Sequence, residues 1–333
     1  MKNKLLDIPK TYYFFGILFL LAVFVQGDFI LDIITMTFIW AALASAWNIS
    51  GGYAGQFSLG HAGFLGVGAY TSTLLYINFE VSPWFGMILG GIIAALFALL
   101  IGVLCFRLKG PFYTLATIAF AELVFISSTQ LRDITNGSMG LQIPFETGFI
   151  NFVFEDANTY AILSFILMFV VFLISSYIKN SKIGYYLIAM REDPDAASSL
   201  GINIKFLKLF ATSLSAFLTA ICGTFLVQYI LFIEPANFLM LSISIKIAMI
   251  AIVGGMNLPI GPVLGAILLT PLELLLRGYT SEIAGLHLFI FGLILLLVVL
   301  VQPKGLAEIS WFKNKKVLRW NGVKQNETKR DIA

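Results

Sequence analysis

The amino-acid sequence predicts an all-α fold, a polytopic integral membrane helical bundle. The chain has 333 residues, of which 59% are hydrophobic and 12% are charged. Soluble domains have about 45–50% apolar and about 25% charged residues, so this composition departs in both directions. The apolar residues form long runs, several of which reach the roughly 20 residues that a helix needs to cross the hydrocarbon core. The short alternating strands of a membrane β-barrel do not occur.

The apolar runs predict about 10 transmembrane helices, within a range of 8–11. The first run follows three lysines and lacks a small-residue cleavage site, so we expect it to be a retained helix and not a removed signal peptide. Together the runs predict a single transmembrane domain over 1–305, followed by a basic tail over 306–333. The expected spans are 12–27, 29–47, 57–79, 84–106, 111–130, 160–178, 208–232, 238–256, 260–276 and 285–301.

The basic residues predict the orientation. All but three of the 21 Lys and Arg residues fall on one side of these crossings, the exceptions being Arg132, Lys246 and Arg277. The positive-inside rule therefore places both termini in the cytoplasm. Lys246 is expected to reach the outer interface by extending its long stem. Glu273 and Arg277 are four residues apart on one helix and are expected to pair.

Two polar joints are longer than a tight turn. Residues 131–159 are predicted to form an extracytoplasmic loop, which is either a plain connection or a lid or docking surface. Residues 181–208 are predicted to form a cytoplasmic loop. In it, Asp193 is a candidate N-cap, Pro194 suits a first helical turn, and Gly201 suits a helix stop. A short cytoplasmic helix is therefore expected, which is either a capped connector or a helix that fits a groove in another protein.

The stretch "GGYAGQFSLGHAGFLGVGAYTSTLL" at 51–75 places seven glycines beside polar side chains. Glycines let helices pack closely or let a membrane helix unwind, which is tolerated only inside protein or beside water. Broken helices of this kind build transporter binding sites, so Gln56, Ser58 and His61 are candidates for a solute path. His61 has no partner cluster for a metal and is expected to form hydrogen bonds. A second joint, "VGGMNLPIGPVLGA" at 254–265, begins with paired glycines and holds two prolines and Asn257. It is expected to break the helical run and to form either a tight turn or a re-entrant segment.

The motifs exclude several chemistries. A P-loop requires Gly-Lys, which occurs nowhere in the chain, so the chain itself is not expected to hydrolyse ATP. Glu122 lies within an expected span, where an ionisable group is either functional or paired with another buried polar group. Neither G-x-S-x-G nor H-E-x-x-H occurs, and the two cysteines define no disulfide framework. We therefore do not expect an enzyme.

Five blocks of sequence resemble one family in its order along the chain. They are "WNISGGYAGQFSLGHAGFLGVGAYT", "GPFYTLATIAFAE", "TNGSMGL", "MREDPDAASSLGIN" and "GGMNLPIGPVLGA". Over residues 30–305 the chain resembles the LivM-type permeases of branched-chain amino acid ABC importers. "DAASSLG" resembles the E-A-A-x-x-x-G motif of such permeases, with Asp195 in place of glutamate. In that family the motif docks into the ATPase. The resemblance implies coupling through Glu192, Asp195, Ala196, Ala197 and Gly201.

The resemblance implies a transmembrane permease subunit with alternating access. Its implied partners are a second permease of the LivH type, two cytoplasmic ATP-binding subunits, an extracytoplasmic substrate-binding protein and the lipid bilayer, without nucleic acid. The chain is expected to bind no cofactor, ATP being used by the partner subunits, and to lie in a bacterial inner (plasma) membrane. The expected substrates are leucine, isoleucine and valine, and the alternative substrates are urea or an amide. The alternative function is that of an ion-coupled secondary carrier acting through Glu122. The candidate path residues are Gln56, Ser58, His61, Glu122 and Asn257.

Overall fold

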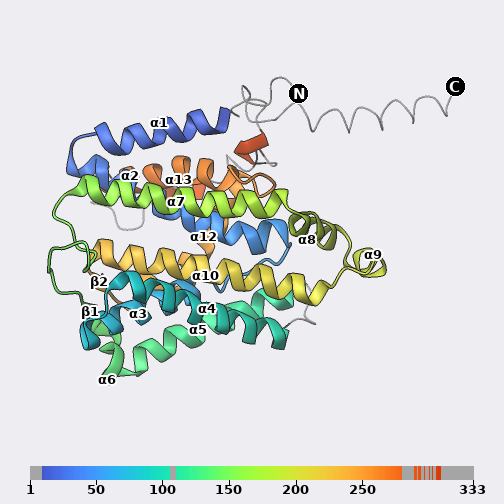
Figure 1. Ribbon diagram of the computed structural model, residues 1–333, viewed down its shortest axis with the longest axis horizontal. Coiled ribbons are helices and arrows are strands. Elements are labelled where there is room, and N and C mark those ends of the chain that lie inside the picture. Colours follow the sequence, from blue (N-terminus) through green and yellow to red (C-terminus); the bar gives the residue numbers. More distant parts are fainter. Residues whose placement is uncertain are drawn as a thin grey trace.

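The computed structural model describes residues 10–105, 110–279, 289, 290, 292, 293, 296, 300, 302 and 305–308. The predicted span 285–301 and the basic tail 306–333 lie largely outside these residues. The long helices run side by side along the long axis of the molecule (Figure 1). They are α1 (Lys10–Phe24), α2 (Asp28–Asn48), α3 (His61–Phe79), α4 (Pro83–Cys105), α5 (Pro111–Gln130), α7 (Ala157–Asn180), α10 (Ile204–Ile230), α12 (Leu241–Gly254) and α13 (Gly261–Tyr279).

Shorter elements connect these helices at the two ends of the bundle. At the end where α8 lies, they are the π-helix η1 (Ile49–Tyr53), α8 (Lys182–Glu192) and α9 (Pro194–Ser199). At the opposite end they are α6 (Arg132–Thr135), η2 (Gly137–Met139), β1 (Leu141–Gln142), β2 (Phe232–Ile233) and α11 (Pro235–Phe238). The last described element is the 3₁₀ turn η3 (Leu306–Glu308).

Local capping explains where several helices begin. The side chain of Asp156 accepts a hydrogen bond from the backbone N–H of Asn158 and starts α7. Ser181 caps α8 in the same way, and Asn203 caps α10 by accepting from the N–H of Phe206 at 3.0 Å. Such side chains satisfy N–H groups that a helix leaves unpaired at its start. The chain can therefore turn sharply between α7, α8 and α10.

Glycines let three helices of the bundle meet at backbone distance. A Cβ added to Gly68 of α3 would overlap the backbone of Ala220 in α10, and one added to Gly90 of α4 would lie 3.0 Å from Gly68. Gly223 of α10 likewise meets the carbonyl of Leu65. Close approach through small residues is the usual way in which membrane helices associate. The glycine-rich start of α3 therefore serves packing against α4 and α10.

Seven helical segments of the described chain are long and apolar enough to cross a membrane. They are Asp28–Tyr53, Pro83–Cys105, Pro111–Gln130, Ala157–Asn180, Ile204–Ile230, Pro235–Gly254 and Gly261–Gly278. The apolar part of α1, Tyr13–Phe24, is shorter, and the largely buried α3 is not among them. The chain is thus an all-α multi-pass membrane protein, as predicted. Its number of crossings, about ten, stays a prediction.

The predicted outer loop is an ordered structure. β1 pairs antiparallel with β2, so that Leu141 lies opposite Ile233, and joins the loop to the end of α10. The hydroxyl of Ser82 and the indole of Trp84 donate to the carbonyls of Ile150 and Phe149. These two short strands are a small addition to the all-α fold. They form where the chain leaves the helices and its backbone groups need partners.

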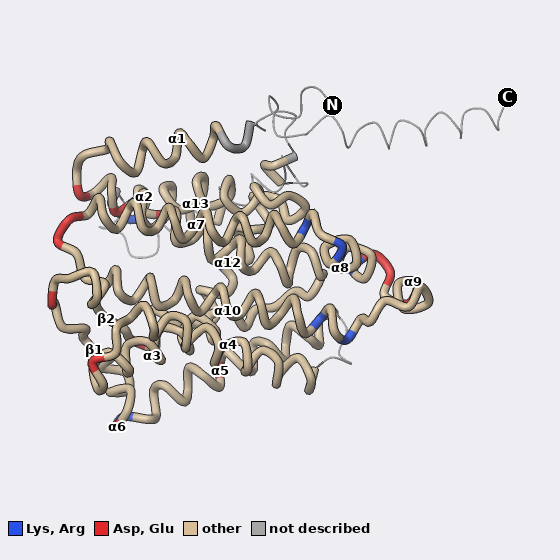
Figure 2. Tube along the Cα trace, viewed as in Figure 1, with Lys and Arg blue, Asp and Glu red and all other residues tan. Residues whose placement is uncertain are grey.

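The described charges are separated along the bundle axis. Figure 2 shows most of the basic residues at the end formed by α8 and by the start of α10, and most of the acidic residues at the opposite end. The exceptions include Arg132 in α6 and the acidic residues beside α9. Because α8 and the start of α10 belong to the predicted cytoplasmic loop 181–208, this distribution supports the predicted orientation.

Candidate functional site

The glycine-rich stretch breaks the helical run between α2 and α3. After α2, the N–H of Ala54 bonds to the carbonyl of Ile49 at 3.3 Å, a π-helical turn, and residues 54–60 are not helical. Gly55 has φ +67°, and an added Cβ would lie 2.5 Å from Cγ of Arg191. Both its backbone conformation and its surroundings favour glycine. The predicted span 57–79 therefore becomes helical only at His61.

Polar side chains of this break are bonded to α2 and α10. Fully buried His61 lies with Nε2 at 2.8 Å from Oγ of Ser215, whose own hydrogen is donated to the carbonyl of Ala46 at 2.7 Å. Since a serine has one hydrogen to give, Nε2 of His61 is the donor.

Two neighbours are held in the same way. The carbonyl of Ser58 accepts from the indole N–H of Trp47 at 2.7 Å, and buried Gln56 accepts through Oε1 from the hydroxyl of Thr212 at 3.1 Å. The structure thus brings the candidates Gln56, Ser58 and His61 together. Their bonds go to this chain's own helices, so they hold the break in place against α2 and α10.

Helix α5 lies directly on the broken stretch. Oγ1 of Thr114 donates to the carbonyl of Phe57 at 2.7 Å, and Oγ1 of Thr117 accepts from the N–H of Leu59 at 3.1 Å. A Cβ added to Gly60 would lie 2.7 Å from the carbonyl oxygen of Thr117, so this contact requires glycine. The backbone groups freed by the break are therefore partly satisfied by α5.

The second glycine joint is a tight turn between α12 and α13, as predicted. Gly255 has φ +108°, and Cβ atoms added to Gly254 or Gly261 would overlap the backbone across the turn. Asn257 is exposed at its tip. The backbone carbonyl of Asn257 accepts a hydrogen bond from Nζ of Lys179 at the end of α7.

Arg191, near the end of α8, connects both joints. Its Nη1 donates to the carbonyl of Gly52 in η1 at 2.8 Å and to Oδ1 of Asn257 at 3.2 Å. Its Nη2 lies 2.7 Å from Oε1 of Glu192, which is the last residue of α8. A guanidinium can serve several acceptors at once because its donors form a rigid planar fork. The sequence analysis used Arg191 only as a positive charge on the cytoplasmic side and did not predict this bridge. The helix break indicates the need for such a residue, because its free carbonyls require hydrogen-bond donors.

The predicted short helix is present as α9. Asp193 caps it, because its Oδ1 accepts from the N–H groups of Asp195 and Ala196 at 2.9 and 3.0 Å. At its end Gly201 has φ +81°, with its N–H on the carbonyl of Ser198. The N–H of Ile202 also donates to the carbonyl of Ala197, and the two hydrogen bonds together form a Schellman motif, which ends the helix. The expectations for Asp193, Pro194 and Gly201 are confirmed.

The surface of α9 differs from the expected coupling contact at one position. Glu192, Asp195, Ala196 and Gly201 are exposed, whereas Ala197 is buried. The side chain of Leu200, which the sequence did not single out, is 81% exposed. An exposed leucine at the tip of a small polar helix is an apolar feature that a partner protein can cover.

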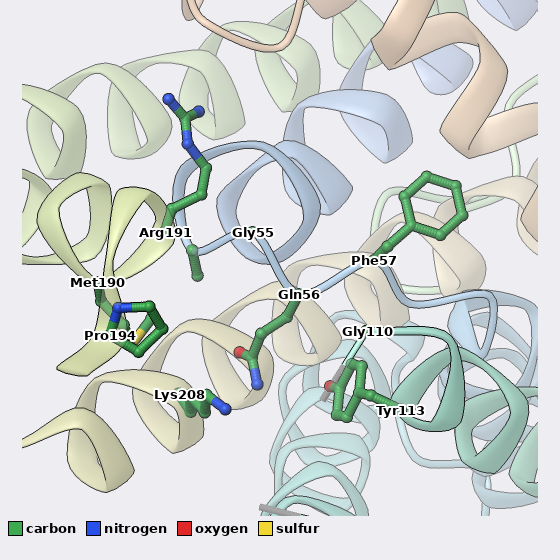
Figure 3. A pocket seen from close by; sticks show the side chains of 10 residues that line it. Gly55, Gln56, Phe57, Gly110, Tyr113, Met190, Arg191, Pro194 and Lys208 are labelled. Carbon is green, nitrogen blue, oxygen red and sulfur yellow. The ribbon is translucent and has the colours of Figure 1, made fainter. Parts of the chain in front are cut away.

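A cavity separates α9 from α5. It has a volume of about 180 Å³ and is bounded by residues 54–57, by Gly110 and Tyr113 at the start of α5, and by Met190, Arg191, Pro194 and Lys208. Figure 3 shows the side chains of Gln56 and Lys208 directed toward this space, while the guanidinium of Arg191 points away from it. Helix α9, the helix break and α5 therefore border one open volume.

Two charged groups of the spans have surroundings that the sequence did not predict. Glu122 is exposed on the outward face of α5, away from the other candidate path residues. The side chain of Lys246 contacts α13 and α2. Its Nζ forms an ion pair with Oε2 of Glu273 at 2.7 Å and lies 3.9 Å from the ring centre of Trp40. The predicted Glu273–Arg277 pair is thus wrong, because packing of α12 on α13 provides a closer cation.

We expect this ion pair to be sensitive to removal of one partner alone. Lys246→Met leaves the Glu273 carboxylate without its cation in a largely buried position, a change that costs about 3–5 kcal/mol in buried pairs. The double variant Lys246→Met, Glu273→Met removes both charges and should recover most of that loss. Thermal unfolding of the three proteins in lipid nanodiscs measures this. Equal melting midpoints for the single and double variants would contradict the expectation.

Comparison with known proteins gives a consistent result. Residues 29–299 match the family described as branched-chain amino acid transport system, permease component. The chain is 28% identical over 302 residues to the high-affinity branched-chain amino acid transport system permease protein LivM of Salmonella typhimurium, which covers 84% of this chain and 70% of that protein. LivM of Escherichia coli gives the same identity and coverage. A probable branched-chain amino acid transport permease protein LivH of Methanocaldococcus jannaschii is 29% identical over 144 residues, 42% of this chain and 45% of that protein. No solved structure matches.

Proposed function

The chain belongs to the permease components of branched-chain amino acid transport systems, and from this premise we propose that it imports branched-chain amino acids by alternating access, driven by separate ATPase subunits. As a member of this family it is a transport subunit and not an enzyme. The substrates proposed are leucine, isoleucine and valine. ATP is consumed by the partners, and this chain binds no cofactor.

The observation that carries the proposal is the connection of α9 to the helix break. Capped helix α9 projects from one end of the bundle (Figure 1). Its neighbour Arg191 bonds to Gly52 in η1 and to Asn257 in the second joint. A force on α9 is thereby transmitted to the two places where the helices are interrupted.

The contact with the ATPase is proposed to lie on the exposed side of α9. Glu192, Asp195, Ala196 and Gly201 contribute polar and backbone surface, and Leu200 contributes the apolar tip. Buried Ala197 acts from beneath as the packing residue of the helix. Apolar residues that fill a partner's pocket commonly dominate the binding free energy of an interface.

The remaining architecture is proposed as follows. Residues 1–305 form one membrane domain in a bacterial inner membrane, with both termini, the loop 181–208 and the tail 306–333 in the cytoplasm. A substrate-binding protein docks outside on surfaces that include the loop 131–159. A second permease of the LivH type completes the path. The shape of that path depends on the helix break and the second joint. The break is held in place by Gln56, Ser58 and His61, and the second joint by Asn257.

Reconstitution tests the function. The chain, its second permease and the two ATPases are placed in proteoliposomes with ATP inside and with substrate and binding protein outside. We expect accumulation of radioactive leucine that requires ATP and every subunit. Urea in place of leucine, and the chain alone with a proton or sodium gradient, are the matched alternatives. Accumulation by the chain alone would overturn the proposal in favour of an ion-coupled carrier.

Leu200 provides a sharp test of the ATPase contact. Leu200→Glu places a charge in a position that the partner is proposed to cover with apolar surface. The charge should lower ATPase association by about tenfold or more, since burying an unpaired charge costs several kcal/mol. Co-purification of the tagged chain with the ATPase measures it. The control is Phe206→Glu, an exposed residue of α10 outside α9. Equal losses for both variants would mean that α9 has no special part in the contact.

A further inference from the structure

We propose that the outward face of α5, centred on Glu122, is the surface through which this chain contacts a second, different permease polypeptide. The inference rests on the proposed function, because it identifies where in this chain the partner permease binds. It follows from the exposure of α5, from the carboxylate on its surface, and from the contacts on its opposite face.

Helix α5 is the least covered candidate span in the described part of the chain. Only 22% of its apolar window is buried, whereas the other six have 33–72%. Its exposed residues recur every three or four positions and so lie on one side of the helix. Apart from Pro111 and Gln130 at the two ends of the helix, they are Phe112, Leu115, Ala119, Glu122, Leu123 and Ile126. We refer to this set as the α5 face.

Glu122 distinguishes the α5 face from the surfaces that suit lipid. On α4 the exposed side chains of the span are apolar, among them Ile92, Leu96 and Leu100. Among the described residues, Glu122 is the only exposed charged side chain more than two turns from both ends of a candidate span. Charged residues within spans almost always face protein or a water-filled cavity, because a charge in hydrocarbon is costly. The α5 face is therefore directed toward the interior of a larger assembly.

The other side of α5 connects this face to the helix break. The side chains of Thr114 and Thr117 form hydrogen bonds with the backbone of Phe57 and Leu59. A Cβ added to Gly63 would lie 3.2 Å from Cα of Ala121. A partner on the α5 face is thus one helix away from the stretch that Arg191 connects to α9. This location suits a path that the two chains enclose together.

Charge indicates that the partner is a different chain. A two-fold contact of α5 with a second copy places equivalent surfaces opposite each other. It would bring two Glu122 carboxylates together, which repel each other when ionised. A different permease with a hydrogen-bond donor opposite Glu122 satisfies the carboxylate. Ala119, one turn away, has a small side chain that allows a helix to approach closely.

Photo-crosslinking in intact membranes tests the proposal. Benzoylphenylalanine replaces Leu115 or Ile126 on the α5 face, or Ile92 or Leu100 on α4 as matched controls, in cells that express the whole transport system. We expect the two α5 positions to give an adduct that mass spectrometry identifies as a second permease of the same family. Its yield should be at least about fivefold above that of the α4 positions, because the probe reacts only with groups in contact.

The other outcomes overturn the proposal. An adduct with a second copy of this chain excludes the different-chain contact, and equal yields on α4 and α5 exclude the α5 face. ATP-driven leucine uptake is measured in the same membranes. If uptake is present and the α5 positions give no adduct, only this inference fails. If the wild-type system shows no ATP-driven uptake, the proposed function itself fails.

Substitution of Glu122 adds an independent measurement. Glu122→Leu should lower co-purification of the second permease by about tenfold, because the partner's donor is left without an acceptor. Glu122→Gln keeps an acceptor of nearly the same shape and should lower it by about twofold or less. A control, Leu96→Gln, changes an exposed α4 position. Unchanged co-purification with Glu122→Leu would overturn the central role of Glu122.

Discussion

Arg191→Met is expected to lower ATP-driven uptake by about tenfold or more while the ATPase stays bound. The substitution removes the hydrogen bonds from α8 to the carbonyl of Gly52 and to Oδ1 of Asn257. Hydrogen bonds to a charged group contribute about 1.5–3 kcal/mol each, so the loss of two uncouples α9 from both joints. The exposed surface of α9 is unchanged, which is why association should persist.

The measurement compares uptake, ATP hydrolysis and subunit co-purification in one preparation. Arg191→Lys retains the charge but loses the planar fork of donors, and we expect an intermediate uptake rate. Lys182→Met, an exposed position at the start of α8, is the control for loss of a positive charge. Normal uptake by Arg191→Met, or loss of the ATPase from the complex, would refute a role in transmission.

Gly68→Ala is expected to destabilise the membrane domain strongly, although it adds one methyl group. The new Cβ would overlap backbone atoms of Ala220 in α10, and Gly90 of α4 closes the space on another side. Backbone atoms in packed helices cannot move away without separating the helices. Overpacking of this kind costs about 1–3 kcal/mol and occasionally more.

Gly16→Ala is the matched control with an expected effect of opposite sign. Gly16 lies in α1 with no atom within 4 Å of an added Cβ. There the exchange should stabilise the helix by about 0.5–1 kcal/mol, because alanine has less backbone freedom to lose. Melting curves of both variants in nanodiscs measure the difference. Similar midpoints for the two would show that the close approach of α3 and α10 is not required.

Features set by neighbouring residues were predictable from the sequence. The short helix α9 was expected because Asp193, Pro194 and Gly201 are all local signals, and the structure confirms each of them. The second joint was expected for the same reason, from its paired glycines and its prolines. These residues act within one or two turns, so nothing distant can override them easily.

Features that depend on distant residues were not predictable. His61 was expected to form hydrogen bonds, but its partner Ser215 lies more than 150 residues away in the chain. The same limit explains the error at Glu273, which was paired by spacing with Arg277 while Lys246 of another helix lies closer. The role proposed for Glu122 depends on a second polypeptide, about which this sequence carries no direct information.

The backbone contacts among α3, α4 and α10 determine how this protein can change shape. Because these helices touch at backbone distance, separating them would open voids in the bundle, so we expect the three to move as one body. Under the proposed alternating access, we therefore expect movement at the surfaces where α3, α4 and α10 meet other helices or another chain, and not among these three helices.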